Sequence, residues 1–128
     1  MSAKNGISPS SEDYLEMIYN LQLKNGFVRT TDIAAELCVS KPSVNRAINT
    51  LKAQDLVEHE LYSEIKLTDK GINLAKNVLH RHTLIKKFLT DIIGVDEEAA
   101  EKEACRMEHC MSETTIKRLG EYVARILG

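Results

Sequence analysis

The tripeptide Cys38-Val39-Ser40 separates two short stretches whose apolar residues recur at helical spacing. These apolar positions are Ile33, Ala34 and Leu37 in the first stretch and Val44, Ile48 and Leu51 in the second. Thr30 is the expected N-cap of the first helix. Ser40 suits the N-cap of the second, and Pro42 is tolerated in its first turn. Two short helices joined this tightly predict a helix-turn-helix.

The flanking segments predict a mainly α fold that carries a small β-hairpin wing. Apolar residues at i, i+3, i+4 and i+7 indicate a helix at about residues 11–24, and alternating residues between 56 and 67 indicate the hairpin. Further helices are expected at 69–93, after Asp96, and from Ser112 or Glu113 onward. We therefore predict a winged helix-turn-helix domain over 1–70 and a helical domain over 71–128, which the long helix 69–93 links.

The distribution of charge and the number of cysteines indicate the possible partners of the chain and its cellular compartment. Residues 41–54 and 70–90 contain basic side chains and no acid, whereas 96–113 contains seven acids. Basic segments could face phosphates and the acidic segment a cation, although both could be ordinary solvated helix faces. The three cysteines form no scaffold pattern, which indicates reduced thiols, and Cys38 and Cys110 are expected to be small core residues. With neither a signal peptide nor a spanning stretch apparent, we expect a cytoplasmic protein without membrane contact.

Six side chains combine the residue types that bind metal ions in proteins. Asp13 and Glu16 stand one turn apart on the first helix, His82 interrupts the apolar stripe of the long helix, and the stretch EACRMEHCMS contains the trio Cys105, Glu108 and His109. Carboxylate, imidazole and thiolate are the three kinds of protein ligand, and the trio shares one helical face. Each has an alternative: Asp13 could serve the helix N-terminus, and His82 could be a hydrogen-bonded core residue.

The sequence lacks the motifs of the common hydrolases. It contains no HExxH, no nucleophile elbow and no glycine-rich phosphate loop. We therefore do not expect an enzyme, and a metalloenzyme is the weakest alternative. A metal-independent winged-helix regulator is the stronger alternative.

Several motifs resemble the diphtheria toxin repressor family of metal-dependent transcriptional regulators, over nearly the whole chain. The resembling segments are SSEDYLEMIYNL, TTDIAAELCVSKPSVNRAINTLKAQDLV, LTDKGINLAKNVLHRH and FLTDIIGVDEEAAEKEACRMEHCMS. The resemblance is closest to the short manganese-transport-regulator branch, which lacks the SH3-like domain of the iron branch. It implies a homodimeric repressor of metal homeostasis that binds double-stranded operator DNA, with residues 71–128 forming the metal-binding and dimerisation domain.

The resemblance also implies roles for individual residues. Metal ligands are expected at Asp13, Glu16, His82, Cys105, Glu108 and His109. On the second helix of the helix-turn-helix, Ser40, Pro42 and Arg46 match positions that face base edges, and Lys41 and Ser43 lie near the backbone; Ser40 and Pro42 could instead only cap the helix. Tyr62 and Lys66 on the wing are further candidates for backbone contacts.

Two departures from the family pattern bear on the metal. Cys105 stands where the manganese branch has a glutamate and the iron branch a cysteine, whereas Asp13 matches the manganese branch. Lys86 and Glu101 replace a glutamate and a histidine of the iron branch's ancillary site. A carboxylate-rich site suits manganese, and a thiolate favours iron or zinc. We expect Mn(II), then Fe(II), with Zn(II) as a third candidate.

Overall fold

The computed structural model describes residues 10–60 and 64–128, which belong to two compact units, Met1–Lys76 and Asn77–Gly128. Each unit has its own hydrophobic core. The mainly helical fold class with a small hairpin is confirmed. The domain boundary between residues 70 and 71 stays a prediction. Among the described residues, no helix is long and apolar enough to cross a membrane.

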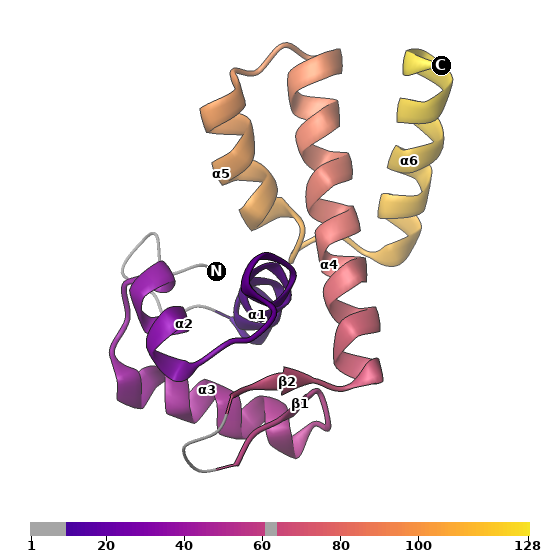
Figure 1. The fold of residues 1–128 in the computed structure, drawn as a ribbon. Coiled ribbons are helices and arrows are strands. Elements are labelled where there is room, and N and C mark those ends of the chain that lie inside the picture. The colour runs from indigo at the N-terminus through magenta and orange to yellow at the C-terminus, as the bar shows by residue number, and fades with distance from the viewer. Residues whose placement is uncertain (1–9, 61–63) are drawn as a thin grey trace. The chain divides into compact units, whose positions relative to one another are not determined.

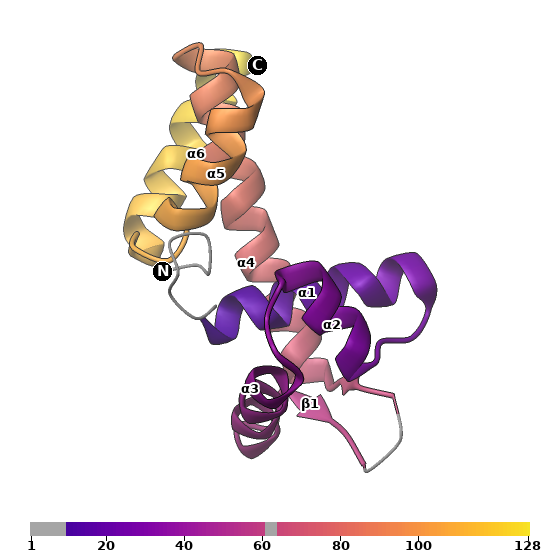
Figure 2. The ribbon, with the colours of Figure 1, turned by 90° about the vertical axis from the view of Figure 1, so that its left-hand side faces the viewer.

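In its described residues, the first unit contains three complete helices, the start of α4 (Asp69–Lys87) and a short antiparallel hairpin. Its elements are α1 (Ser11–Asn25), α2 (Thr30–Leu37), α3 (Lys41–Ala53), β1 (Val57–Glu58) and β2 (Lys66–Leu67). The register pairs Val57 with Leu67 and Glu58 with Lys66, and an isolated bridge joins Val28 to Ile65. In Figure 2 α3 lies beside β1, and the hairpin projects away from α1. This is the arrangement of a winged helix-turn-helix.

Local signals begin and end these helices. Ser10 and Asp13 form a capping box at the start of α1, and Gly26 ends the helix in the left-handed region at φ 80°. Cys38 adopts the same conformation, at φ 55°, in the turn before α3. The N-cap of α2 is Arg29 rather than Thr30, which is already helical, and the Arg29 N–H donates to the Asp32 carboxylate (2.9 Å).

The core of the first unit follows the predicted apolar faces. Ile18, Ile33, Val44, Ile48 and Leu51 are all essentially inaccessible to solvent. Such side chains each contribute roughly 1.5–3 kcal/mol when fully buried. Burial of one stripe per helix therefore fixes α1, α2 and α3 against one another and leaves the opposite face of α3 exposed.

The second unit holds three helices around a smaller core. α4 (Asp69–Lys87) starts in the first unit, continues as the π-helical turn η2 (Phe88–Ile92), and is followed by α5 (Glu97–Met107) and α6 (Glu113–Leu127). Ile85, Leu89, Ala100, Ala104 and Ile116 form the core. Figure 1 shows α5 and α6 beside the end of α4. Asp96 and Ser112 cap α5 and α6, as predicted.

The π-helical turn is a local departure from the predicted regular helix. The Ile93 N–H donates to the Phe88 carbonyl (3.2 Å), five residues back. The Thr90 hydroxyl donates to the Lys86 carbonyl (3.1 Å), which competes with the regular backbone ladder. The helix ends at Ile92, and Gly94 follows at φ 75°.

Three expectations at other positions need correction or lie outside the described residues. Cys38 and Cys110 are exposed, so the prediction that they are core residues is wrong. Both lie outside regular helix: Cys38 caps the end of α2, and Cys110 follows the end of α5. Tyr62 lies outside the described residues.

Candidate metal centre and DNA-binding helix

The predicted DNA-binding residues lie together at the start of α3. The Ser43 N–H donates to Ser40 Oγ (3.2 Å), so the predicted capping role of Ser40 is confirmed. The Arg46 guanidinium donates to Ser43 Oγ (3.1 Å), one turn further along. Ser40, Lys41, Pro42 and Arg46 are exposed and Ser43 is half-buried. The helix thus presents a polar, basic end without a neutralising acid in its first turn.

Two lysines that carried no predicted role connect the end of α3 to its neighbours: Lys52 contacts the hairpin segment, and Lys70 at the start of α4 contacts the C-cap of α3. Lys52 Nζ donates to the His59 carbonyl (2.8 Å), and Lys70 Nζ donates to the Gln54 carbonyl (3.1 Å). Lys66 on β2 is exposed and pairs with Glu64 (3.5 Å).

Tyr14 in α1 is buried, and this burial raises the pKa of its hydroxyl group, although the positive charge of Arg46 opposes the shift.

In the second unit, α4 and the end of α5 bring His82 and Glu108 together. His82 Nδ1 lies 3.1 Å from Glu108 Oε1, and its Nε2 lies 2.7 Å from Glu101 Oε2. His82 is 9% exposed and Glu108 is completely buried. His82 is therefore a buried, hydrogen-bonded histidine, and its partners include a predicted metal ligand; its own role as a ligand stays a prediction.

Glu108 has one carboxylate oxygen that its neighbours do not satisfy. Among the described residues, Oε2 of Glu108 is the buried side-chain oxygen or nitrogen without a hydrogen-bond partner. Leaving such an oxygen buried and unpaired is costly, and an ion or a water usually accounts for it. The adjoining imidazole and carboxylate suit a first-row divalent cation. The residues present thus fit the metal that the sequence pattern predicts.

Cys105 and His109 form a second pair in the same unit. A ring nitrogen of His109 and the Sγ atom of Cys105 lie within 4.8 Å of each other. Cys105 is buried and His109 is half-buried. The predicted helical face needs a correction here, because α5 ends at Met107 and Glu108 is its C-cap. Glu108 keeps helical backbone angles, whereas His109 lies in the turn that follows the helix.

An arginine that the sequence analysis missed fixes this segment. Arg81 on α4 donates to the Glu108 carbonyl (3.1 Å) and to the Met111 carbonyl (3.2 Å). Glu108 is the C-cap of α5, where backbone carbonyls lack helical partners, and Met111 lies in the turn between α5 and α6. No sequence signal marks this contact, because it spans about thirty residues of chain.

The first unit supplies the predicted carboxylates of α1. The Ser10 N–H donates to Asp13 Oδ2 (3.2 Å), so Asp13 does serve the helix N-terminus. Glu16 follows one turn later and is half-buried. The role of Asp13 as a metal ligand stays a prediction.

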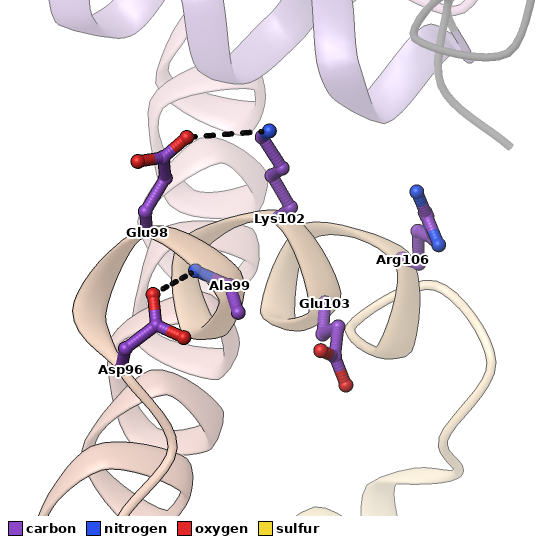
Figure 3. A pocket seen from close by; sticks show the side chains of 6 residues that line it. All are labelled: Asp96, Glu98, Ala99, Lys102, Glu103 and Arg106. Atoms are coloured by element: carbon purple, nitrogen blue, oxygen red, sulfur yellow. Dashed lines mark hydrogen bonds and ion pairs between the residues drawn. The ribbon is translucent and has the colours of Figure 1, made fainter.

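A hollow on the surface of α5 does not involve the predicted ligands. Its lining residues are Asp96, Glu98, Ala99, Lys102, Glu103 and Arg106 (Figure 3). Glu98 pairs with Lys102 (3.6 Å), and Asp96 accepts from the Ala99 N–H. Acidic and basic side chains mix on the exposed face of α5, which is the pattern of a solvated helix face.

Comparison with known proteins identifies both halves of the chain. Residues 6–65 match the model of the iron dependent repressor N-terminal DNA binding domain, and residues 68–126 match the iron dependent repressor metal binding and dimerisation domain. The HTH-type transcriptional regulator MntR of Bacillus subtilis is 39% identical over 116 residues, covering 91% of this chain and 81% of that protein. An HTH-type regulator of Methanocaldococcus jannaschii is 40% identical over 114 residues, covering 88% and 91%.

Solved structures agree with this assignment. The manganese regulator SloR superimposes with a TM-score of 0.81 at 30% identity, and T. acidophilum IdeR with 0.80 at 32%. The matches cover 92% of this chain and 55% of each solved chain, so this chain spans about half their length. The chain therefore belongs to the iron-dependent repressor family, whose members are metal-responsive DNA-binding transcriptional regulators and not enzymes.

Proposed function

We propose that this chain is a cytoplasmic, homodimeric repressor of metal-homeostasis genes that binds operator DNA when loaded with Mn(II). The observation that carries the proposal is the buried, unpartnered Oε2 of Glu108, whose other oxygen lies 3.1 Å from His82. The carboxylate and the imidazole together offer the oxygen and nitrogen ligands that a divalent cation can use.

The proposed ligands are Asp13, Glu16, His82, Cys105, Glu108 and His109. Three of the six are carboxylates, which suit Mn(II), while two imidazoles and a thiol raise the affinity for Fe(II) and Zn(II). We rank Mn(II) first, Fe(II) second and Zn(II) third. Relatives are described as manganese regulators, and one solved relative was crystallised with zinc, which supports this set of candidates.

The proposed switch depends on repulsion between carboxylates. Asp13 and Glu16 come from the first unit and Glu108 from the second, so without a neutralising charge they disfavour a close approach. When bound, the cation supplies that charge. The carboxylates can then share one site and hold the two units in one orientation, which leaves less conformational freedom to lose at the DNA.

On the DNA, α3 would enter the major groove. Arg46 is exposed and offers a guanidinium that can pair with a guanine edge, while Ser40 and Pro42 can contact thymine methyl groups. Lys41 and Ser43 would contact the phosphate backbone. A two-fold dimer would place two such helices in successive major grooves, roughly 34 Å apart.

The test is recovery of genomic DNA fragments by the purified protein at one salt concentration, under reducing anaerobic conditions. The protein is supplied with chelator, Mn(II), Fe(II) or Zn(II). We expect enrichment of a few fragments only with metal, at the lowest dose for Mn(II). His109→Ala should need at least about tenfold more metal, which corresponds to about 1.4 kcal/mol.

Arg46→Ala is the matched control, because it should lose fragment enrichment while metal binding is unchanged. Enrichment that is equal with chelator and with metal would instead support a metal-independent winged-helix regulator. A full metal response in His109→Ala would remove that residue from the switch.

A further inference from the structure

A continuous series of polar contacts leads from the surface of the second unit to Glu108. Lys86 Nζ lies 3.1 Å from Glu101 Oε1, and Glu101 Oε2 lies 2.7 Å from His82 Nε2. His82 Nδ1 in turn lies 3.1 Å from Glu108 Oε1. Glu101 therefore contacts Lys86 with one oxygen and His82 with the other.

The contact with Glu101 determines how the imidazole of His82 can be used. A ring nitrogen that donates to a carboxylate keeps its proton, so the opposite nitrogen must provide the lone pair for a metal. Here the nitrogen next to Glu101 is Nε2, and the opposite nitrogen, Nδ1, faces Glu108.

We propose that Glu101, itself held by Lys86, is a positioning residue that orients His82 so that Nδ1 is presented to the metal beside Glu108. The inference rests on the proposed function, since it assumes that His82 and Glu108 bind a divalent cation. Lys86 pairs with Oε1 of Glu101. This ion pair restricts rotation of the Glu101 carboxylate and keeps Oε2 directed at His82 Nε2.

A purely structural role makes a different prediction. The side chain of Glu101 is 52% exposed, and exposed ion pairs contribute little to folding stability. Loss of Glu101 should then alter neither the metal affinity nor the state of the His82 ring. Partners that orient a ligating histidine, by contrast, typically account for about 10- to 100-fold in metal affinity.

Glu97 provides a matched control within the same cluster. It pairs with the same lysine, at 3.3 Å from Lys86 Nζ, and its side chain is 82% exposed. The described contacts of Glu97 do not include His82. Removing its charge therefore perturbs Lys86 without removing the contact to the imidazole.

The experiment uses the full chain and titrates it with Mn(II), while the free ion is followed by electron paramagnetic resonance. Glu101→Ala should weaken Mn(II) binding by about 10- to 100-fold. Glu101→Gln, which keeps a hydrogen-bond acceptor, should fall between Glu101→Ala and the wild type. Lys86→Met should show a smaller loss than Glu101→Ala, and Glu97→Gln should bind like the wild type.

A second readout reports on His82 directly. In the Zn(II)-loaded wild type, long-range proton–nitrogen NMR should show the proton of His82 on Nε2, with Nδ1 carrying the metal. Glu101→Ala should lose the slowly exchanging Nε2 proton. Thermal unfolding of the metal-free variants checks that each of them folds.

The possible failures are distinguishable. If the wild type binds neither Mn(II) nor Zn(II), the result contradicts both the proposed function and the positioning role of Glu101. If the wild type binds metal and Glu101→Ala binds it equally tightly, with the Nε2 proton retained, only the positioning role of Glu101 is overturned.

Discussion

Ser40 shows how one side chain can serve the fold and leave a surface ready for a ligand. Its hydroxyl oxygen accepts the Ser43 N–H at the start of α3, and the residue itself is exposed. The cap fixes the first turn of α3, which carries Lys41, Pro42 and Ser43. Capping thus contributes to DNA binding indirectly, through the geometry of the helix end.

Ser40→Ala should destabilise the first unit by about 1 kcal/mol, because an orphan N–H at the start of α3 loses its acceptor. Ser40→Asn retains a capping oxygen and should lie within a few tenths of a kcal/mol of the wild type. Urea unfolding followed by circular dichroism measures both variants. Equal stability of Ser40→Ala and the wild type would show that water replaces the cap at no cost.

At the residue scale, the sequence indicated the candidate metal ligands, but it did not indicate which side chains form hydrogen bonds with them. His82 stood out because an imidazole interrupts an apolar stripe, whereas Asp13 and Glu108 stood out because residues of ligand type recur one turn apart on a helix. Their partners Glu101, Lys86 and Arg81 were not recognised as such, because hydrogen bonds between α4 and α5 depend on tertiary packing. The exposure of Cys38 was missed for a similar reason: its backbone has a positive φ in a tight turn, which residue type alone does not reveal.

At the scale of elements, repeating apolar patterns predicted the helices, and the polar residues before them predicted the caps of α3, α5 and α6 but not that of α2. The exceptions lie where regular geometry stops. The π-helical turn at Phe88–Ile92 follows from an additional residue in one turn, and α5 ends at Met107 although its apolar spacing continues. Periodicity describes the interior of a helix and gives little information about how its last turn closes.

At Gly71, α4 lies close against the backbone of Leu56 in the segment leading to β1. A Cβ atom at this position would lie 2.0 Å from the Leu56 carbonyl oxygen and 3.0 Å from its carbon. Backbone atoms cannot move aside cheaply, so Gly71→Ala should destabilise the first unit by about 1–3 kcal/mol or more. Urea unfolding measures the loss.

Gly120→Ala is the comparison for this substitution. In α6 the nearest atom to an added Cβ would be Leu84 Cδ2, at an ordinary contact distance of 3.5 Å. Replacing glycine inside a helix should then stabilise the second unit by about 0.5–1 kcal/mol. Destabilisation of similar size by both substitutions would contradict the assignment of the Gly71 effect to Leu56.

At the scale of the whole molecule, α6 exposes an apolar stripe. Its members Tyr122, Ile126 and Leu127 are 39%, 51% and 41% exposed. Apolar side chains at this spacing on a terminal helix favour an association between copies, as the family's dimerisation domain would require.

Ile126→Asp should weaken dimerisation by at least about 2 kcal/mol, or roughly 30-fold in dissociation constant, because it places a charge in an apolar contact. Lys117→Asp, on the opposite side of α6, should leave the dimer intact. Sedimentation equilibrium distinguishes the two variants. A dimer of unchanged affinity in Ile126→Asp would place the contact between copies on another surface.

The continuity of α4 has a consequence for how such chains can be recombined. The helix contributes Ala75 to the first core and Ile85 to the second, and it runs unbroken across the boundary between Lys76 and Asn77. Any chimera joined there must preserve helical phase, since one inserted residue turns everything downstream by about 100°. The two units are therefore not freely exchangeable modules, and an insertion or deletion in α4 must respect the helical repeat.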